Sequence, residues 1–229
     1  MNETLPLSAP AGPIVFDCDG TLVGTEGVWD GAYAILFQRH HATLARADRH
    51  ALIGLTLDGL GLELARLLDQ PGRHQELAAE TFELVSSNLG RGIPPMPGAV
   101  ELVTELSGHR RMAVASNTIR SAVIDYLTGI GIHHHIDHIV GSDDVAAPKP
   151  APDVYLHACN LLEVDPHDAI AVEDSAAGAL AAKTAGLFVI GVPSQPDQPL
   201  PAADLIYPNL SDPQLRRLLR YPTPNRRIA

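Results

Sequence analysis

The chain has 229 residues, of which 45% are hydrophobic and 19% are charged. This length and balance predict a folded protein with one main core and room for an inserted unit. The formal net charge of −11 and the pI near 5.3 exclude a broadly cationic surface, so we expect neither nucleic acid nor an anionic membrane as a partner. Any anionic ligand must therefore be attracted by a few local cations.

The two cysteines and the two ends of the chain bear on the cellular location of the protein. Cys18 and Cys159 have no short pair spacing, which favours reduced thiols in a cytoplasmic protein. The first residues lack the basic and apolar regions of a signal peptide, and no membrane span is visible. We expect loose tails at residues 1–12 and 221–229.

Apolar, β-branched runs alternate with helical patterns along the chain, which is typical of an α/β protein with a doubly wound parallel sheet. The strand candidates are, in chain order, residues 14–17, 112–116, 138–140, 169–173, 188–192 and 204–207. The helix candidates of this alternation are residues 100–106, 119–128, 154–162 and 176–185. In such sheets, ligands bind where the parallel strands end.

The first strand candidate runs directly into Asp17 and Asp19, which are followed by Gly20 and Thr21. Because side chains alternate along a strand, both carboxylates are expected on the same side of its end. Two like charges there are unfavourable unless a cation joins them. The alternative is an ordinary polar loop that follows a strand. This alternative does not explain why two like charges lie on the same side of the strand end. The pattern favours a hard-metal site in which one aspartate attacks phosphorus.

Four polar segments follow one another at the expected strand ends or in the loops between. They are 13–22 with Asp17 and Asp19, 112–118 with Ser116, 147–153 with Lys149, and 170–178 with Glu173 and Asp174. In sequence and order, these segments resemble the four motifs of the haloacid dehalogenase-like (HAD) phosphohydrolases. Their Lys-Pro-x-Pro and Glu-Asp-Ser-x-x-Gly forms are most similar to the subgroup with phosphoglycolate phosphatase, β-phosphoglucomutase and small sugar-phosphate phosphatases.

The interval 28–89 contains no strand-like run. Its amphipathic stretches are residues 33–37, 60–68 and 77–85. By the resemblance, this interval is the helical cap of the subgroup, inserted after the first motif. The expected division is a catalytic core of residues 13–23 and 92–220 and a cap of residues 24–91. Glycines and prolines in the two connections suit a hinge, although an ordinary pair of loops is the alternative.

The resemblance implies a phosphatase that needs Mg²⁺ and forms a phosphoaspartate. Asp17 would be the nucleophile, and Asp19 would be the general acid and base. Mg²⁺ would be held by the Asp17 carboxylate, the Asp19 main-chain carbonyl and the Asp174 carboxylate. Glu173 would act through a water bound to the metal, because its side chain is longer. A helix N-cap cluster is the alternative for Glu173 and Asp174.

The resemblance also implies a phosphate-binding set. Contacts to phosphate are expected from Gly20, Thr21, Ser116, Asn117 and Lys149. Of these, Ser116 and Lys149 would also take part in catalysis with the two aspartates. Helix capping is the alternative for Ser116 and the favoured interpretation of Ser175. Lys149 lies between two prolines, which suits a fixed cation, and a solvated surface lysine is its alternative.

Two departures from the subgroup bear on the reaction. Trp29 and Leu57 stand where a β-phosphoglucomutase would carry His and Arg, which favours release of phosphate to water. Asp19 argues against a haloacid dehalogenase, which lacks a second aspartate there. We therefore predict hydrolysis of a small phosphorylated metabolite, a sugar phosphate or a phosphoglycolate-type acid, by a monomer or small homo-oligomer. A phosphosugar mutase and a non-catalytic phosphometabolite-binding regulatory protein are the alternatives.

Overall fold

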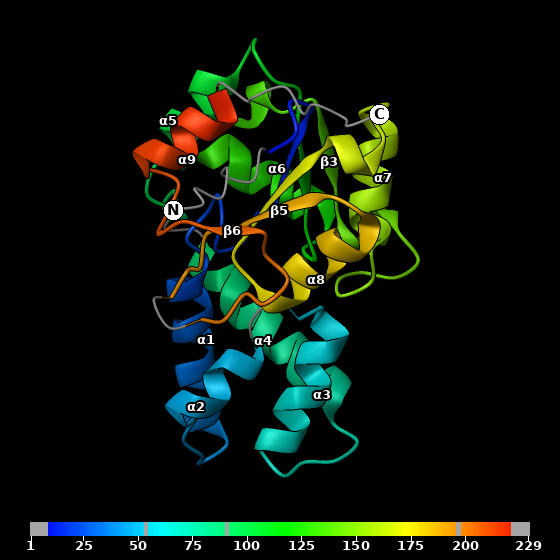
Figure 1. Ribbon diagram of the computed structural model, residues 1–229. Coiled ribbons are helices and arrows are strands. Elements are labelled where there is room, and N and C mark those ends of the chain that lie inside the picture. The colour runs from blue at the N-terminus through cyan, green and yellow to red at the C-terminus, as the bar shows by residue number, and fades with distance from the viewer. Residues whose placement is uncertain (1–8, 53–54, 90–91, 196–197, 221–229) are drawn as a thin grey trace, which may run out of the picture.

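The computed structural model describes residues 9–52, 55–89, 92–195 and 198–220. Within these residues, six strands form one parallel sheet in the order β3-β2-β1-β4-β5-β6 (Figure 1). The strands are β1 (Ile14–Phe16), β2 (Met112–Ala115), β3 (His138–Val140), β4 (Ile170–Glu173), β5 (Phe188–Gly191) and β6 (Leu205–Ile206). Each strand lies inside a predicted range, so the doubly wound parallel sheet is confirmed.

Helices cover both faces of this sheet. They are α5 (Ala99–Leu106), α6 (Arg120–Gly129), α7 (Asp153–Leu161), α8 (Ala176–Ala185) and α9 (Pro213–Arg220), with the short 3-10 helices η2 (His133–His135), η3 (Ser142–Asp144) and η4 (Pro166–Asp168). The four predicted helices agree with α5 to α8 within one residue at each end. The helix α9 was not predicted. The carboxylate of Asp212 caps it by accepting hydrogen bonds from the N–H groups of Gln214 and Leu215.

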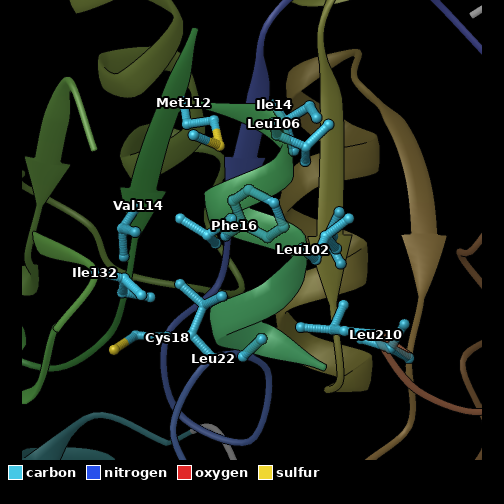
Figure 2. Packing of buried hydrophobic residues seen from close by; sticks show 14 of the residues in the cluster. Ile14, Phe16, Cys18, Leu22, Leu102, Leu106, Met112, Val114, Ile132 and Leu210 are labelled. Carbon is cyan, nitrogen blue, oxygen red and sulfur yellow. The ribbon is translucent and has the colours of Figure 1, made fainter. Parts of the chain in front are cut away.

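The central strand β1 is buried on both sides because its side chains alternate between two cores. Ile14 and Phe16 pack in the core that contains residues of α5, α6 and α9, whereas Val15 packs in the core that contains residues of α7 and α8. Figure 2 shows Phe16 in the first core, close to Leu102 of α5 and Val114 of β2. Phe16 is fully buried, so truncating it to alanine would cost about 3–5 kcal/mol.

The register of the sheet aligns the ends of β1, β2 and β4. Phe16 is paired with Val114 on one side and with Val172 on the other. The residues that follow these strands therefore emerge together at the carboxyl edge of the sheet. This edge is where the sequence places the predicted site.

A second group of helices lies between β1 and α5 in the sequence and gathers below the sheet in Figure 1. These elements are α1 (Glu26–Arg39), α2 (Arg46–Arg49), η1 (His50–Leu52), α3 (Leu57–Leu67) and α4 (His74–Leu89). They share their own hydrophobic cluster, with Leu36, Leu64 and Leu77 fully buried in it. We call this group the cap. Its exact limits at residues 24 and 91 stay a prediction, and residues 90–91, like the predicted tail residues 1–8 and 221–229, lie outside the described residues.

The two connections between cap and sheet run side by side. The N–H of Gly24 donates to the carbonyl of Pro94 at 2.8 Å, and the N–H of Met96 donates to the carbonyl of Leu22 at 3.0 Å. The cap is thus joined to the core through one paired crossing.

In the described part of the chain, no helix has the length and apolar character to cross a membrane.

Candidate active site

One cleft at the carboxyl edge of the sheet collects most of the predicted site residues. From the core it is lined by Asp17, Asp19, Gly20, Ser116, Asn117, Thr118, Lys149, Asp174, Ser175 and Gln195, and from the cap side by Thr25, Trp29, Asp30, Tyr33, Arg49, Leu52, Leu55 and Leu60. Its volume is about 830 Å³, including space open to solvent. Glu173 and Thr21 do not line the cleft; both are buried, at 0% and 1% exposure.

Asp17 and Lys149 form a buried ion pair in this cleft. Lys149 Nζ donates to Asp17 Oδ1 at 2.5 Å, and the two side chains are only 3% and 9% exposed. The other oxygen, Asp17 Oδ2, is buried and has no hydrogen-bond partner among the described residues. An oxygen in this condition is suited to a ligand that the protein itself does not supply.

Burial also sets the protonation of this pair. It raises the pKa of Asp17 to about 7, although the ammonium of Lys149 acts in the opposite direction. For Lys149, burial acts to lower the pKa, but the carboxylates of Asp17 and Glu173 outweigh it, so the pKa is raised. Lys149 is therefore a permanent cation at neutral pH.

Glu173 is the last residue of β4 and is held by hydrogen bonds at both carboxylate oxygens. Its Oε1 accepts from Lys149 Nζ at 2.6 Å and from the Tyr155 hydroxyl at 2.7 Å. Its Oε2 accepts from the N–H and the hydroxyl of Ser175, at 3.1 and 3.0 Å. The Ser175 hydroxyl in turn accepts from the N–H of Gly178, which confirms Ser175 as the N-cap of α8. In this arrangement Glu173 positions Lys149.

Asp19 is oriented by two hydroxyl groups that follow β2. Its Oδ2 accepts from Ser116 Oγ at 3.2 Å and from Thr118 Oγ1 at 2.9 Å. The Ser116 hydroxyl also accepts from the N–H of Thr118, so it closes the turn before α6. The sequence analysis did not predict the contact of Thr118 with Asp19. Its only indication in the sequence is a hydroxyl residue two positions after Ser116.

Asn117 fixes the backbone on which Lys149 stands. Its Nδ2 donates to the carbonyl of Lys149 at 3.1 Å, and its Oδ1 accepts from the N–H of Lys149 at 2.8 Å. These paired bonds link the end of β2 to the loop before α7 across 32 residues of sequence. The predicted contact of Asn117 with phosphate stays a prediction.

Three buried acids could hold a metal ion. Ligand oxygens of Asp17, Glu173 and Asp174 all lie within 4.8 Å of one another. Burial raises the pKa of Asp174, and the neighbouring Asp17 carboxylate raises it further. Gly20 has φ +87, and a Cβ there would overlap the carboxylate of Asp174, so only glycine fits this turn. The crowded carboxylates and the unpartnered Asp17 oxygen fit a hard divalent cation.

Known proteins of similar sequence indicate the family to which the chain belongs. Residues 14–192 match the haloacid dehalogenase-like hydrolase family. The chain is 33% identical over 211 residues to the validoxylamine A 7'-phosphate phosphatase of Streptomyces hygroscopicus subsp. limoneus, covering 86% of this chain and 93% of that protein. It is 31% identical over 208 residues, 89% of its own length, to the bifunctional riboflavin kinase/FMN phosphatase of Arabidopsis thaliana, of which it spans only 55%.

Solved structures agree with the sequence relatives. The structure of CbbY from Rhodobacter sphaeroides in complex with phosphate superimposes with a TM-score of 0.71 at 29% identity, covering 87% of this chain and 95% of that one. The fold and the matching family thus define a hydrolase with a doubly wound, parallel-sheet core. The chain belongs to the haloacid dehalogenase-like hydrolase family, which confirms the predicted family and its phosphatase and mutase subgroup.

Proposed function

We propose that the protein hydrolyses a small phosphorylated metabolite with the help of Mg²⁺ and through a phosphoaspartate on Asp17. As a member of this family with phosphatase relatives, it is a phosphoric monoester hydrolase. One observation supports the proposed Mg²⁺ and phosphoaspartate most directly. Among the described residues, one carboxylate oxygen of Asp17 has no hydrogen-bond partner while Lys149 holds the other, in a cleft that is open to solvent.

The metal would be held by the acids at the end of β1 and β4. In this proposal the carboxylates of Asp17 and Asp174 and the main-chain carbonyl of Asp19 are direct ligands, and Glu173 acts through a water. When bound, Mg²⁺ would neutralise negative charge on the substrate phosphate and on the acids around it. Lys149 adds a fixed positive charge on the same side of the cleft.

In the first half-reaction, one carboxylate oxygen of Asp17 forms a bond to phosphorus while the bond from phosphorus to the leaving oxygen breaks. The carboxyl of Asp19 gives its proton to that oxygen, so the leaving group departs as a neutral alcohol. Ser116 and Thr118 hold the Asp19 carboxylate in place through their hydroxyls. Asn117, which lines the cleft, would bind a phosphate oxygen, as expected from the sequence. The same expectation is corrected for Gly20, because its N–H donates to the carbonyl of Val23 at 2.9 Å, and Thr21 does not line the cleft.

In the second half-reaction, water attacks the phosphorus of the phosphoaspartate. The Asp19 carboxylate takes a proton from that water, and the bond between Asp17 and phosphorus breaks. The products are inorganic phosphate and the original aspartate. Asp19 therefore serves both steps, as an acid first and as a base second.

The relatives support a small substrate and a cap that selects it. They include a fructose-1-phosphate phosphatase of Escherichia coli and a (DL)-glycerol-3-phosphatase of Arabidopsis thaliana, at 28% and 29% identity. We propose that the helices between residues 24 and 91 act as a specificity cap over the core. We also propose that the enzyme is cytoplasmic and is a monomer or a small homo-oligomer.

A phosphosugar mutase is the second candidate, because the chain is 35% identical over 124 residues to the β-phosphoglucomutase of Bacillus subtilis. That match covers 54% of this chain. Trp29 and Leu57, in place of the expected His and Arg, favour the hydrolase. A protein that only binds phosphate esters would not need the buried pair of Asp17 and Lys149.

The experiment is a phosphate-release assay over a panel of phosphorylated metabolites, with and without Mg²⁺, on the enzyme and on Asp17→Asn. The proposal expects turnover that chelation removes, that Mg²⁺ restores and that Asp17→Asn abolishes. With a hexose phosphate, inorganic phosphate should appear without an isomeric hexose phosphate. Near-normal turnover by Asp17→Asn contradicts the mechanism, and isomerisation faster than hydrolysis supports the mutase.

A further inference from the structure

The cap side of the cleft is built from aromatic and aliphatic side chains. Trp29 and Tyr33 of α1 lie with their ring centroids 6.0 Å apart. The aliphatic residues of the same wall are Leu52, Leu55 and Leu60. This wall shares the cleft with Asp17 and Lys149, so it would contact the part of a substrate that leaves with the alcohol oxygen.

One ion pair interrupts this apolar wall. Arg49 Nη2 donates to Asp30 Oδ2 and so joins α2 to α1. The side chains of Arg49 and Asp30 remain 34% and 36% exposed, and both line the cleft. Each therefore keeps hydrogen-bonding capacity for a ligand, since a guanidinium carries five N–H donors and a carboxylate accepts several bonds. Burial and the nearby Asp30 raise the pKa of Tyr33, so its hydroxyl stays protonated.

The charge of the wall is balanced. Asp30 compensates Arg49, and Lys149, on the opposite side, is already paired with Asp17 and Glu173. Among the described residues that line the cleft, no other side chain is a lysine or an arginine. A carboxylate or a second phosphate on the leaving group would lose its hydration without gaining an uncompensated cation there.

We infer that the leaving group is a neutral, polyhydroxylated ring, that is, a sugar or cyclitol without a second charged group; this inference rests on the proposed function. The apolar C–H face of such a ring packs against Trp29 and the leucines. Its hydroxyls donate to the Asp30 carboxylate and accept from the Arg49 guanidinium. The geometry favours sugar monophosphates over phosphoglycolate-type acids and over bisphosphates.

The test compares kcat/KM for a hexose monophosphate, a hexose bisphosphate and phosphoglycolate with that for acetyl phosphate, which has only a small leaving group. The variants are Arg49→Gln and Asp30→Asn. The matched control is Arg66→Gln on α3, which breaks an ion pair with Glu63 outside the cleft. Dividing each value by that for acetyl phosphate cancels any loss of folded protein.

The enzyme should prefer the hexose monophosphate. Arg49→Gln should lower the ratio of hexose monophosphate to acetyl phosphate by about tenfold or more, because a charge-assisted hydrogen bond is lost. Asp30→Asn should lower the same ratio and raise the ratios for phosphoglycolate and the bisphosphate, because Arg49 is then uncompensated. Arg66→Gln should change none of them.

Two results overturn the inference in distinguishable ways. If acetyl phosphate is turned over but phosphoglycolate or the bisphosphate is preferred, or if Asp30→Asn leaves the ratios unchanged, the proposed function stands and the inferred leaving group is wrong. If no ester releases phosphate under any condition, the proposed function fails and the inference falls with it.

Discussion

Gly178 lies in the first turn of α8, directly against the Glu173 carboxylate. A Cβ at position 178 would overlap both oxygens of that carboxylate. Glu173 cannot retreat without losing bonds from Lys149, Tyr155 or Ser175. We therefore expect Gly178→Ala to displace Glu173 and, through it, the ammonium of Lys149.

The expected loss combines opposing contributions. Replacing a helical glycine with alanine stabilises a helix by roughly 0.5–1 kcal/mol. Breaking a buried ion pair costs about 3–5 kcal/mol. The free energy of unfolding of Gly178→Ala should thus fall by roughly 2–4 kcal/mol. A shift of Lys149 by about 1 Å should lower kcat by a factor on the order of 100.

The assay pairs urea unfolding with phosphate release at saturating Mg²⁺. The control is Gly129→Ala at the end of α6, where a Cβ would have no neighbour within 4 Å. It should keep full activity and equal or higher stability. If Gly178→Ala behaves like Gly129→Ala in both measurements, Glu173 does not position Lys149 and the reasoning is refuted.

Two further predictions concern the same buried charges. Tyr155→Phe removes the hydroxyl that donates to Glu173, so the free energy of unfolding should fall by about 1–3 kcal/mol. Urea titration measures this loss, and an unchanged midpoint would contradict the contact. Burial raises the pKa of Asp17 from 3.8 to about 7, so between these values the folded protein keeps a proton that the unfolded chain releases. In chelator, stability should therefore decrease as the pH rises from 4 to 7, and Mg²⁺ should raise the melting temperature more at pH 8 than at pH 5.5. Thermal melts of the wild type and of Asp17→Asn check both trends. If the stability of the wild type relative to Asp17→Asn increases from pH 4 to 7 instead of decreasing, the raised pKa of Asp17 is refuted.

The inner strands β1, β2 and β4 were predictable because both of their faces are buried. A parallel strand covered on two sides is a continuous apolar run, as in residues 112–115. Such a run can be predicted from the local sequence without knowing which strands pair with it. The helix α9 was missed because it is short and rich in arginine, with Leu215 and Leu219 as its buried residues. Its packing against α5 is a tertiary contact that local sequence does not reveal.

In the site, the sequence identified residues but not the bonds between them. Asp17, Lys149 and Asp174 could be selected from their motifs and strand-end positions. The bonds of Asn117 to the backbone of Lys149, and of Tyr155 to Glu173, join segments that lie 32 and 18 residues apart. Such pairings depend on the folded geometry, so the role of Glu173 in holding Lys149 emerged only from the structure.

Direct detection of a phosphoryl group on Asp17 tests the central claim. The enzyme is mixed with Mg²⁺ and a hexose monophosphate, quenched in acid during turnover, digested and analysed by mass spectrometry. We predict a phosphorylated peptide with the modification on Asp17, present during turnover and absent once the substrate is exhausted. Steady turnover with no phosphoryl group on Asp17, or with the group on another residue, would contradict the account.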